Sequence, residues 1–304
     1  MSDRHARSWS DFWAADAAAG GGSGCLPEGY RGIQAAQQSA WRRFAADLPK
    51  GARFLDLATG DGRVMAWIMA ARRDAKAFGC DLAPRLPEPP RGARVKAGVP
   101  MEALPYPDGR FAAVTSQFGF EYSDTGRSAA EVARVVRTGG RIGLAMHRGD
   151  GPILAHNLKR RAQIAWALEE RGLVNRAKDS LKSRAIGIAA IPQDLVAAPA
   201  EGARIHGPQS AAWEIAEAVR QTLHLGARDH PANVARTLDT IAGKAANELG
   251  RIESLEAACR TADDTRKLEA GFAAAGLAIV SRTPVCEDGK SAPFATFWEL
   301  TRPD

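Results

Sequence analysis

Hydrophobic and polar residues alternate in blocks along the middle of this chain. Between residues 52 and 147, short apolar runs of strand length are separated by segments with the spacing of a one-sided helix. The strands that this pattern predicts are Arg53–Leu57, Ala77–Asp81, Arg94–Ala97, Ala112–Ser116 and Gly140–Met146, with helices near Arg63–Arg73 and Ser128–Arg137. Because strands that alternate with helices are joined by crossovers, this order predicts a parallel sheet with helices on its faces.

Helical patterns dominate the segment before this core. Trp9, Phe12 and Trp13 recur at near-helical spacing, and Ile33–Leu48 carries its apolar residues on one face. Between them, residues 14–29 are rich in Ala and Gly, which predicts a connector. We therefore expect residues 1–50 to form an N-terminal helical cap and residues 51–150 to form the core.

Residues 151–265 differ from the core, because they are mostly helical and poor in strand signals. Apolar residues recur every three or four positions from Val234 to Ile252, which marks one stripe on a helix. After this segment, Arg266–Ala275 is expected to be a helix and Leu277–Val285 and Pro293–Leu300 are expected to be strands. The short link with Asp288-Gly289 between these strands favours an antiparallel hairpin, so residues 266–304 would return to the core.

Composition narrows the class of protein. The 304 residues are 45% hydrophobic and 25% charged, as in an ordinary globular protein, and no apolar run approaches the roughly 18 residues of a membrane span. The N-terminus lacks an apolar secretory core, so a cytoplasmic location is expected. Four scattered cysteines without a Cys-x-x-Cys pair predict neither a disulfide framework nor a metal site. The net charge of +6 is not concentrated in one basic stretch, which disfavours a nucleic-acid partner.

The most informative segment runs from Phe54 to Val64. An apolar strand there contains Asp56, enters a turn with Gly60 and Gly62, and opens a helix. Such turns present backbone N–H groups and a helix N-terminus to a ligand. A dinucleotide fingerprint would need a glycine where Met65 stands, and a phosphate-binding P-loop would need Gly-Lys-Ser/Thr, which does not follow.

This segment resembles the S-adenosylmethionine (SAM) loop of class I methyltransferases, whose pattern is Asp-x-x-x-Gly-x-Gly. Ala58 stands where that family usually has a further glycine. Other landmarks follow in the family's order: Asp81 after the second strand, the segment Leu104-Pro105-Tyr106-Pro107-Asp108, and Gly139-Gly140 before the fifth strand. The resemblance covers residues 50–150 and, in part, the strand pair at 277–300, but not the helical segment between them.

The resemblance implies a cofactor site for SAM along the strand ends. Asp56 would orient the ammonium group, the loop of Ala58, Gly60 and Gly62 would let the ligand approach the backbone, and Asp81 would accept the ribose hydroxyls. The remaining cofactor contacts would come from Leu82, Met101, Gln117 and Phe118. The acid that often binds the adenine amino group in this family is missing, since Val99 and Pro100 stand near its place.

On the acceptor side, Glu121 and Tyr122 would face the substrate, and His147 at the end of the fifth strand is the candidate general base, with Glu121 as the second catalytic candidate. The expected fold is then an α/β, Rossmann-like seven-stranded and mostly parallel sheet. It ends in an antiparallel strand pair and carries a large helical insertion between strands five and six.

The expected function is methyl transfer from SAM to a small-molecule acceptor. Two alternatives stay open, an RNA methyltransferase and a SAM-fold binding protein that has lost catalysis. The sequence also leaves open whether the insertion packs internally, forms a lid over the active site, or joins two copies of the chain as a homodimer.

Overall fold

The computed structural model describes residues 3–19, 31–184 and 190–303. The chain separates into two compact units, one made of Met1–Leu154 and Glu253–Asp304 and the other of Ala155–Ile252. The expected connector begins later than its composition suggests, because residues 14–18 continue the first helix, α1 (Asp3–Ala18). Residues 20–29 of that connector lie outside the described residues.

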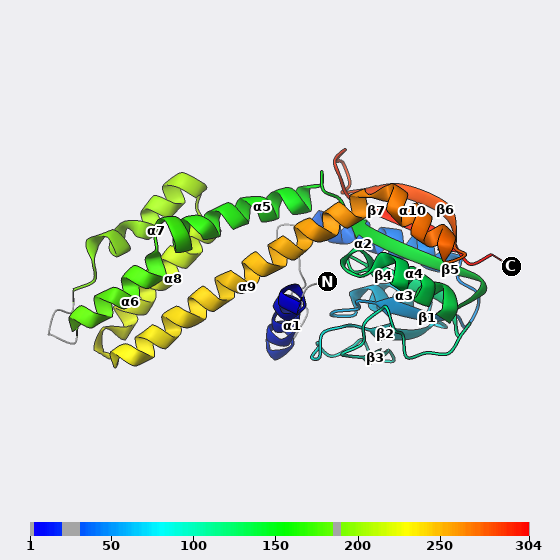
Figure 1. Ribbon diagram of the computed structural model, residues 1–304, viewed down its shortest axis with the longest axis horizontal. Helices are drawn as coiled ribbons and strands as arrows, with labels where there is room; N and C mark the ends of the chain where they lie inside the picture. The colour runs from blue at the N-terminus through cyan, green and yellow to red at the C-terminus, as the bar shows by residue number, and fades with distance from the viewer. Residues whose placement is uncertain (1–2, 20–30, 185–189, 304) are drawn as a thin grey trace. The chain divides into compact units, whose positions relative to one another are not determined.

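A seven-stranded sheet forms the centre of the first unit, with the strand order β3-β2-β1-β4-β5-β7-β6 (Figure 1). Strands β1 to β5 pair in parallel, and β7 is antiparallel to both β5 and β6. The bounds are β1 Arg53–Leu57, β2 Lys76–Cys80, β3 Arg94–Lys96, β4 Phe111–Gln117, β5 Val136–His147, β6 Ala278–Cys286 and β7 Pro293–Thr301. The expected mostly parallel sheet with an antiparallel C-terminal pair is confirmed, as is the helical insertion between β5 and β6.

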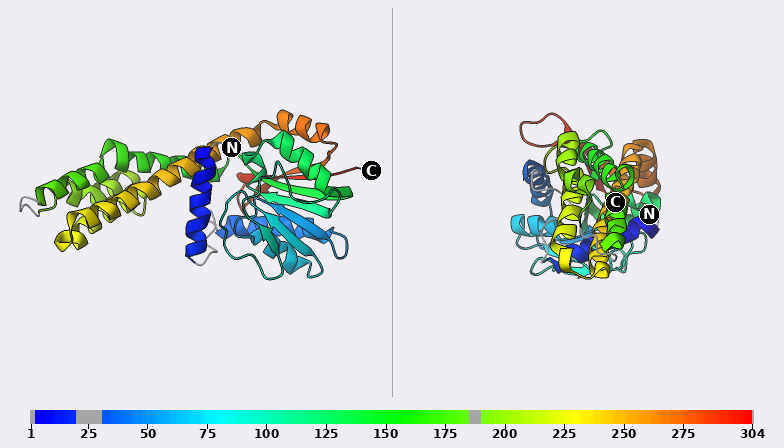
Figure 2. Two further views of the ribbon diagram at one scale, coloured as in Figure 1. Left: turned by 60° about the horizontal axis from the view of Figure 1, so that its bottom comes forward. Right: turned by 90° about the vertical axis from the view of Figure 1, so that its left-hand side faces the viewer.

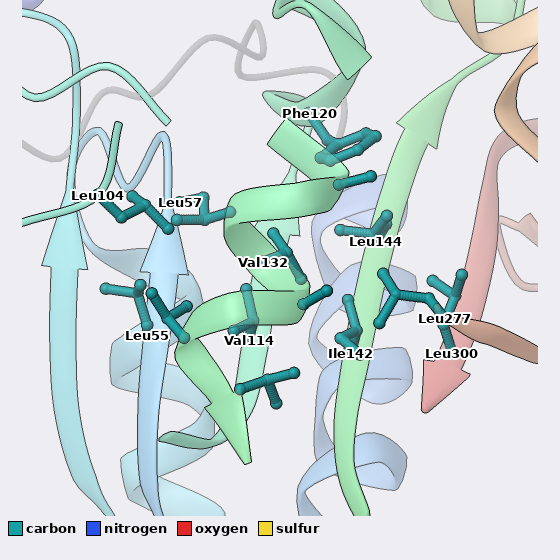
Figure 3. Packing of buried hydrophobic residues seen from close by; sticks show 14 of the residues in the cluster. Leu55, Leu57, Leu104, Val114, Phe120, Val132, Ile142, Leu144, Leu277 and Leu300 are labelled. Carbon is teal, nitrogen blue, oxygen red and sulfur yellow. The ribbon is translucent and has the colours of Figure 1, made fainter. Parts of the chain in front are cut away.

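Helices cover both faces of this sheet (Figure 1). Helices α4 (Thr125–Val135) and α10 (Thr265–Ala274) bury one face in a hydrophobic core of aliphatic and aromatic side chains (Figure 3). That core includes Leu55, Leu57, Val114, Val132, Ile142, Leu144, Leu277 and Leu300. On the other face lie α2 (Arg31–Ala46) and α3 (Arg63–Ala71), where Trp41 packs edge-on against Phe297 of β7 with ring centroids 4.9 Å apart. Residue alternation along each strand divides the side chains between these two layers.

The fifth strand starts earlier than expected. Helix α4 ends at Val135, and Val136 already pairs with Phe111 of β4, so the predicted helix end at Arg137 is wrong. The turn at Gly139, where φ is 68°, lies within the bounds of β5 and coincides with a register shift between Phe111 and Ala113. Pairing with β4 therefore overrides the local helical pattern of these residues.

The second unit consists of helices around a core of its own. Its elements are α5 (Pro152–Ala165), a π-helical turn (Trp166–Glu170), α6 (Leu173–Arg184), α7 (Gln193–His206), α8 (Ala211–Leu225), a 3₁₀ turn (Gly226–Arg228) and α9 (Pro231–Asp263). The apolar stripes of α8 and α9 meet in this core, which contains Val219, Leu223, Val234 and Leu238. These four residues of the two stripes therefore pack inside the second unit. No helix in the described ranges combines the length and apolarity that a membrane span needs.

Candidate active site

The glycine turn links β1 to α3 in a left-handed backbone path. Ala58, Gly60 and Gly62 have φ values of 51°, 51° and 74°. The amide of Thr59 donates to the carbonyl of Cys80 at 3.1 Å, which ties the turn to the end of β2. Ala58 therefore adopts the conformation that glycine would take there, at a cost of about 1–2 kcal/mol for a side chain with a Cβ.

Asp56 is buried beneath this turn, with 1% of its surface exposed. The hydroxyls of Thr59 and Thr115 each donate to its carboxylate at 2.7 Å. Burial nevertheless raises the pKa of Asp56 to about 7, and the hydroxyl bonds only partly oppose that rise. A cationic ligand group beside Asp56 would favour its charged form. Neither threonine was among the site residues expected from the sequence.

Asp81 comes to the same turn from the end of β2. One carboxylate oxygen accepts the amide of Gly60 and the other accepts the amide of Ala83, both at 2.9 Å. Burial raises the pKa of Asp81, and these backbone donors oppose that rise. Each oxygen keeps a second lone pair for a ligand hydroxyl. The next residue, Leu82, is 41% exposed and is free to contact a ligand.

The Leu-Pro-Tyr-Pro segment is held against α4 by Arg134. This guanidinium donates to the carbonyls of Tyr106 at 2.7 Å and Leu104 at 2.9 Å. Met101 lies just before the segment, is partly buried and packs against the hydrophobic core of the first unit. The amide of Val99 donates to the carbonyl of Asp81 at 2.8 Å, so this loop starts beside the acid that ends β2.

Gln117 and Phe118 lie at the carboxyl end of β4, as expected. The indole N–H of Trp41 donates to Gln117 Oε1 at 2.8 Å, which leaves the Gln117 amino group for another partner. Phe118 has a φ of 55° and stacks on His147, with ring centroids 4.0 Å apart and an interplanar angle of 25°. The end of β4 and the end of β5 are therefore joined through two rings.

Glu121 and His147 form a buried pair beside those rings. Glu121 Oε1 lies 2.8 Å from His147 Nδ1 and also accepts the backbone amide of His147 at 2.9 Å. A carboxylate at Nδ1 favours the tautomer with its proton there, which leaves Nε2 as a lone-pair acceptor. Glu121 Oε2 is buried and has no hydrogen-bond partner among the described residues. Both residues were candidates from the sequence, but their pairing was not foreseen.

Helix α1 lies beside the sheet (Figure 2), and its aromatic side chains contact residues at the ends of the strands. A Cβ on Gly60 would come within 2.6 Å of Trp13 Cη2, so the indole rests directly on the glycine turn. Trp9 meets Tyr122 edge-on, with ring centroids 5.7 Å apart, and Tyr122 meets His147 in the same way at 5.9 Å. The aromatic residues of the N-terminal segment thus contact both the glycine turn and Tyr122.

Part of this chain is similar to known proteins. Residues 55–144 match a family model described as a methyltransferase domain. The demethylmenaquinone methyltransferase of Thermus thermophilus is 37% identical over 115 residues, which are 34% of this chain and 51% of that protein. The ubiquinone/menaquinone biosynthesis C-methyltransferase UbiE of Geotalea uraniireducens is 35% identical over 116 residues, or 33% of this chain and 49% of that protein.

The chain thus spans about half the length of the curated relatives it matches. Among solved structures, the Burkholderia thailandensis 1,6-didemethyltoxoflavin-N1-methyltransferase is 20% identical, with 50% of this chain and 68% of that chain covered and a TM-score of 0.37. No conclusion about function follows from a likeness at that level. The family model and the sequence relatives identify residues 55–144 as a methyltransferase domain.

Proposed function

We propose that this protein transfers a methyl group from SAM to a small-molecule acceptor, with His147 as the general base and Glu121 as the residue that positions it. The observation that carries the proposal is the buried Glu121–His147 pair, which stands at the carboxyl ends of the parallel strands. Ligands of open α/β sheets bind outside these ends. The relatives named as quinone methyltransferases support a small acceptor.

The residues around the glycine turn fit the chemistry of SAM. SAM carries a sulfonium and an ammonium group, and Asp56 and Asp81 are acids whose pKa values are raised by burial, so a cationic ligand beside them would favour their charged forms. Asp56 would hold the ammonium group, directly or through water. Asp81 would accept the ribose hydroxyls, and the exposed side chain of Leu82 would pack on the sugar or base.

The bound cofactor supplies an electrophilic methyl group for an in-line displacement. On the acceptor, His147 Nε2 would take the proton from the atom that forms the new bond to carbon. The sulfur of the cofactor would keep the electron pair of the broken carbon–sulfur bond. Glu121 would stabilise the resulting imidazolium through Nδ1–H, and general-base catalysis of this kind contributes about 10²–10⁴-fold in rate.

The rings of Phe118, Tyr122 and His147 favour a planar acceptor. They contact one another in stacked and edge-on arrangements beside the proposed base. An aromatic acceptor would gain from similar contacts, which contribute about 0.5–1.5 kcal/mol per pair beyond buried area. The similarity to a demethylmenaquinone methyltransferase and to a ubiquinone/menaquinone biosynthesis C-methyltransferase supports a ring of this kind.

A transfer assay tests this function. Purified protein is incubated with SAM labelled in its methyl group and, separately, with a small-molecule extract and total RNA from the source cells. We expect label in the small-molecule fraction, and a loss of about 10²-fold or more for His147→Gln with unchanged affinity for S-adenosylhomocysteine. Label in the RNA fraction, with affinity that falls steeply as salt rises, would overturn the small-molecule proposal.

A further inference from the structure

Gln37 is a buried polar residue on the apolar face of α2. It lies at four-residue intervals between Ile33 and Trp41, and only 3% of its surface is exposed. Neither its amide oxygen nor its amide nitrogen has a hydrogen-bond partner in the part of the chain that the structure describes. Native proteins hold few such groups, because a buried amide without a partner is destabilising. The described residues therefore leave both polar atoms of Gln37 without a partner.

Two contacts fix the level of Gln37 along the sheet. At the start of α2, Gly32 lies against Glu287 of the link between β6 and β7, and near its end Phe44 lies against Gly143 of β5. Strand β7 begins beside the carboxyl end of β5, where Ala295 pairs with His147. The N-terminus of α2 is thus at the carboxyl edge of the sheet.

Gln37 therefore lies closer to that edge than Trp41, one helical turn away on the same face. Trp41 in turn donates to Gln117 Oε1, so the amide group of Gln117 lies beside Trp41. Gln117 pairs with Ala145 of β5, two residues before His147. Gln117 and the proposed base thus lie at adjacent strand ends, and Gln37 lies on the turn of α2 nearer that edge.

An amide side chain presents a donor and an acceptor in one plane. Its best partner is a group with the same two functions side by side, as at the edge of a carboxamide or a lactam. We propose that Gln37 determines acceptor specificity by binding such an edge, with the Gln117 amino group as a second donor. The proposal rests on the proposed function, because it assigns Gln37 to the acceptor side of that site.

Stability of the free protein is the first test. Gln37→Met keeps the shape of the side chain and removes both polar atoms. Because replacing an unpartnered buried polar group by an apolar one is neutral or stabilising, we expect the urea midpoint of Gln37→Met to equal or exceed that of the wild type. Gln34→Met makes the same change at an exposed position of α2 and is the matched control. A clearly lower midpoint for Gln37→Met alone would show that ordered water or the protein itself satisfies Gln37, and would overturn the proposal.

Binding of simple probes is the second test. Benzamide carries the proposed edge, and ethylbenzene is an apolar molecule of similar shape. With the protein saturated by S-adenosylhomocysteine, the Trp41 indole N–H signal reports binding near Gln117 by NMR. We expect wild type and Gln34→Met to prefer benzamide by about tenfold, and Gln37→Met to lose that preference.

Equal binding of both probes to wild type, or a preference that survives in Gln37→Met, would overturn the role of Gln37. The proposed function fails separately, because its failure is a loss of S-adenosylhomocysteine binding by the wild type, measured before any probe is added.

Discussion

The methyl carbon of Ala58 occupies the space in which a side chain at Gly119 would begin. A Cβ built on Gly119 would overlap Ala58 Cβ and would lie 3.0 Å from Ser116 Oγ. The two positions belong to the turns that follow β1 and β4, which are neighbouring strands. The alanine in the glycine turn is thus accommodated by a glycine in the next loop.

This relationship predicts a coupled pair of substitutions. Gly119→Ala should destabilise the protein by about 1–3 kcal/mol, because the added methyl group overpacks against Ala58. Ala58→Gly alone should be close to neutral, since relief of the left-handed strain is offset by the entropy of glycine in the unfolded chain. In the double variant the loss from Gly119→Ala should shrink by about 1 kcal/mol or more, measured by urea unfolding. Additive effects of the two changes would contradict the overlap.

The stability of the unliganded protein should depend on pH through Asp56. Its pKa in the folded state is raised to about 7 from an ordinary value of 3.8, so between these pH values the folded protein keeps a proton that the unfolded chain has lost. The stabilisation that the Asp56 proton contributes to the folded protein is therefore complete below pH 3.8, and it is lost as pH rises through 7.

Asp56→Asn removes this titration and keeps the shape of the side chain. Relative to wild type, the variant should gain more than ~1 kcal/mol in unfolding free energy between about pH 4.5 and about pH 7.5. Urea unfolding at the two pH values measures the change. If the difference in unfolding free energy between variant and wild type is the same at both pH values, Asp56 ionises normally.

Cofactor binding should release a proton from the same residue. An ammonium group beside Asp56 stabilises its ionised form and lowers its pKa, so near pH 6.5 the bound state holds less of the proton than the free state. Calorimetric titration with S-adenosylhomocysteine in two buffers of different ionisation enthalpy counts the protons released. We expect a measurable release for wild type and a smaller one for Asp56→Asn. Identical release from both proteins would place the ammonium group elsewhere.

The Glu121–His147 pair predicts the tautomer of the imidazole. With the carboxylate at Nδ1, neutral His147 should carry its proton on Nδ1, and nitrogen NMR distinguishes this form from the other. Glu121→Gln replaces the carboxylate by an amide that can donate, so the Nε2–H form should become more populated. A wild-type protein with its proton on Nε2 would remove His147 as the base.

The sequence predicted much of the fold, because the decisive signals are local. Apolar runs of strand length marked all seven strands, and Asp56, Gly60 and Asp81 were expected at one edge since parallel strands end together. The contacts of Asp56 with Thr115 and of Gln117 with Trp41 could not be predicted, since each joins residues 59 or 76 positions apart.

Gln37 is a polar residue at an apolar position of a helical stripe, and this can be seen in the sequence. Its lack of a hydrogen-bond partner among the described residues can be seen only in the structure. The start of β5 was mistaken for a helix end for a related reason. The pairing of Val136 with Phe111 decides where β5 begins, and the local pattern of residues does not indicate which strand will pair with it.

Calorimetric titration of the purified protein with SAM and S-adenosylhomocysteine tests the central claim most directly. We predict saturable one-to-one binding of both, weakened about tenfold or more by Asp81→Asn, which removes a charged acceptor for the ribose hydroxyls. An analogue without the ribose 2′-hydroxyl should bind wild type more weakly and lose less affinity in the variant. The absence of binding heat for either ligand at several temperatures would contradict the assignment of this site to SAM.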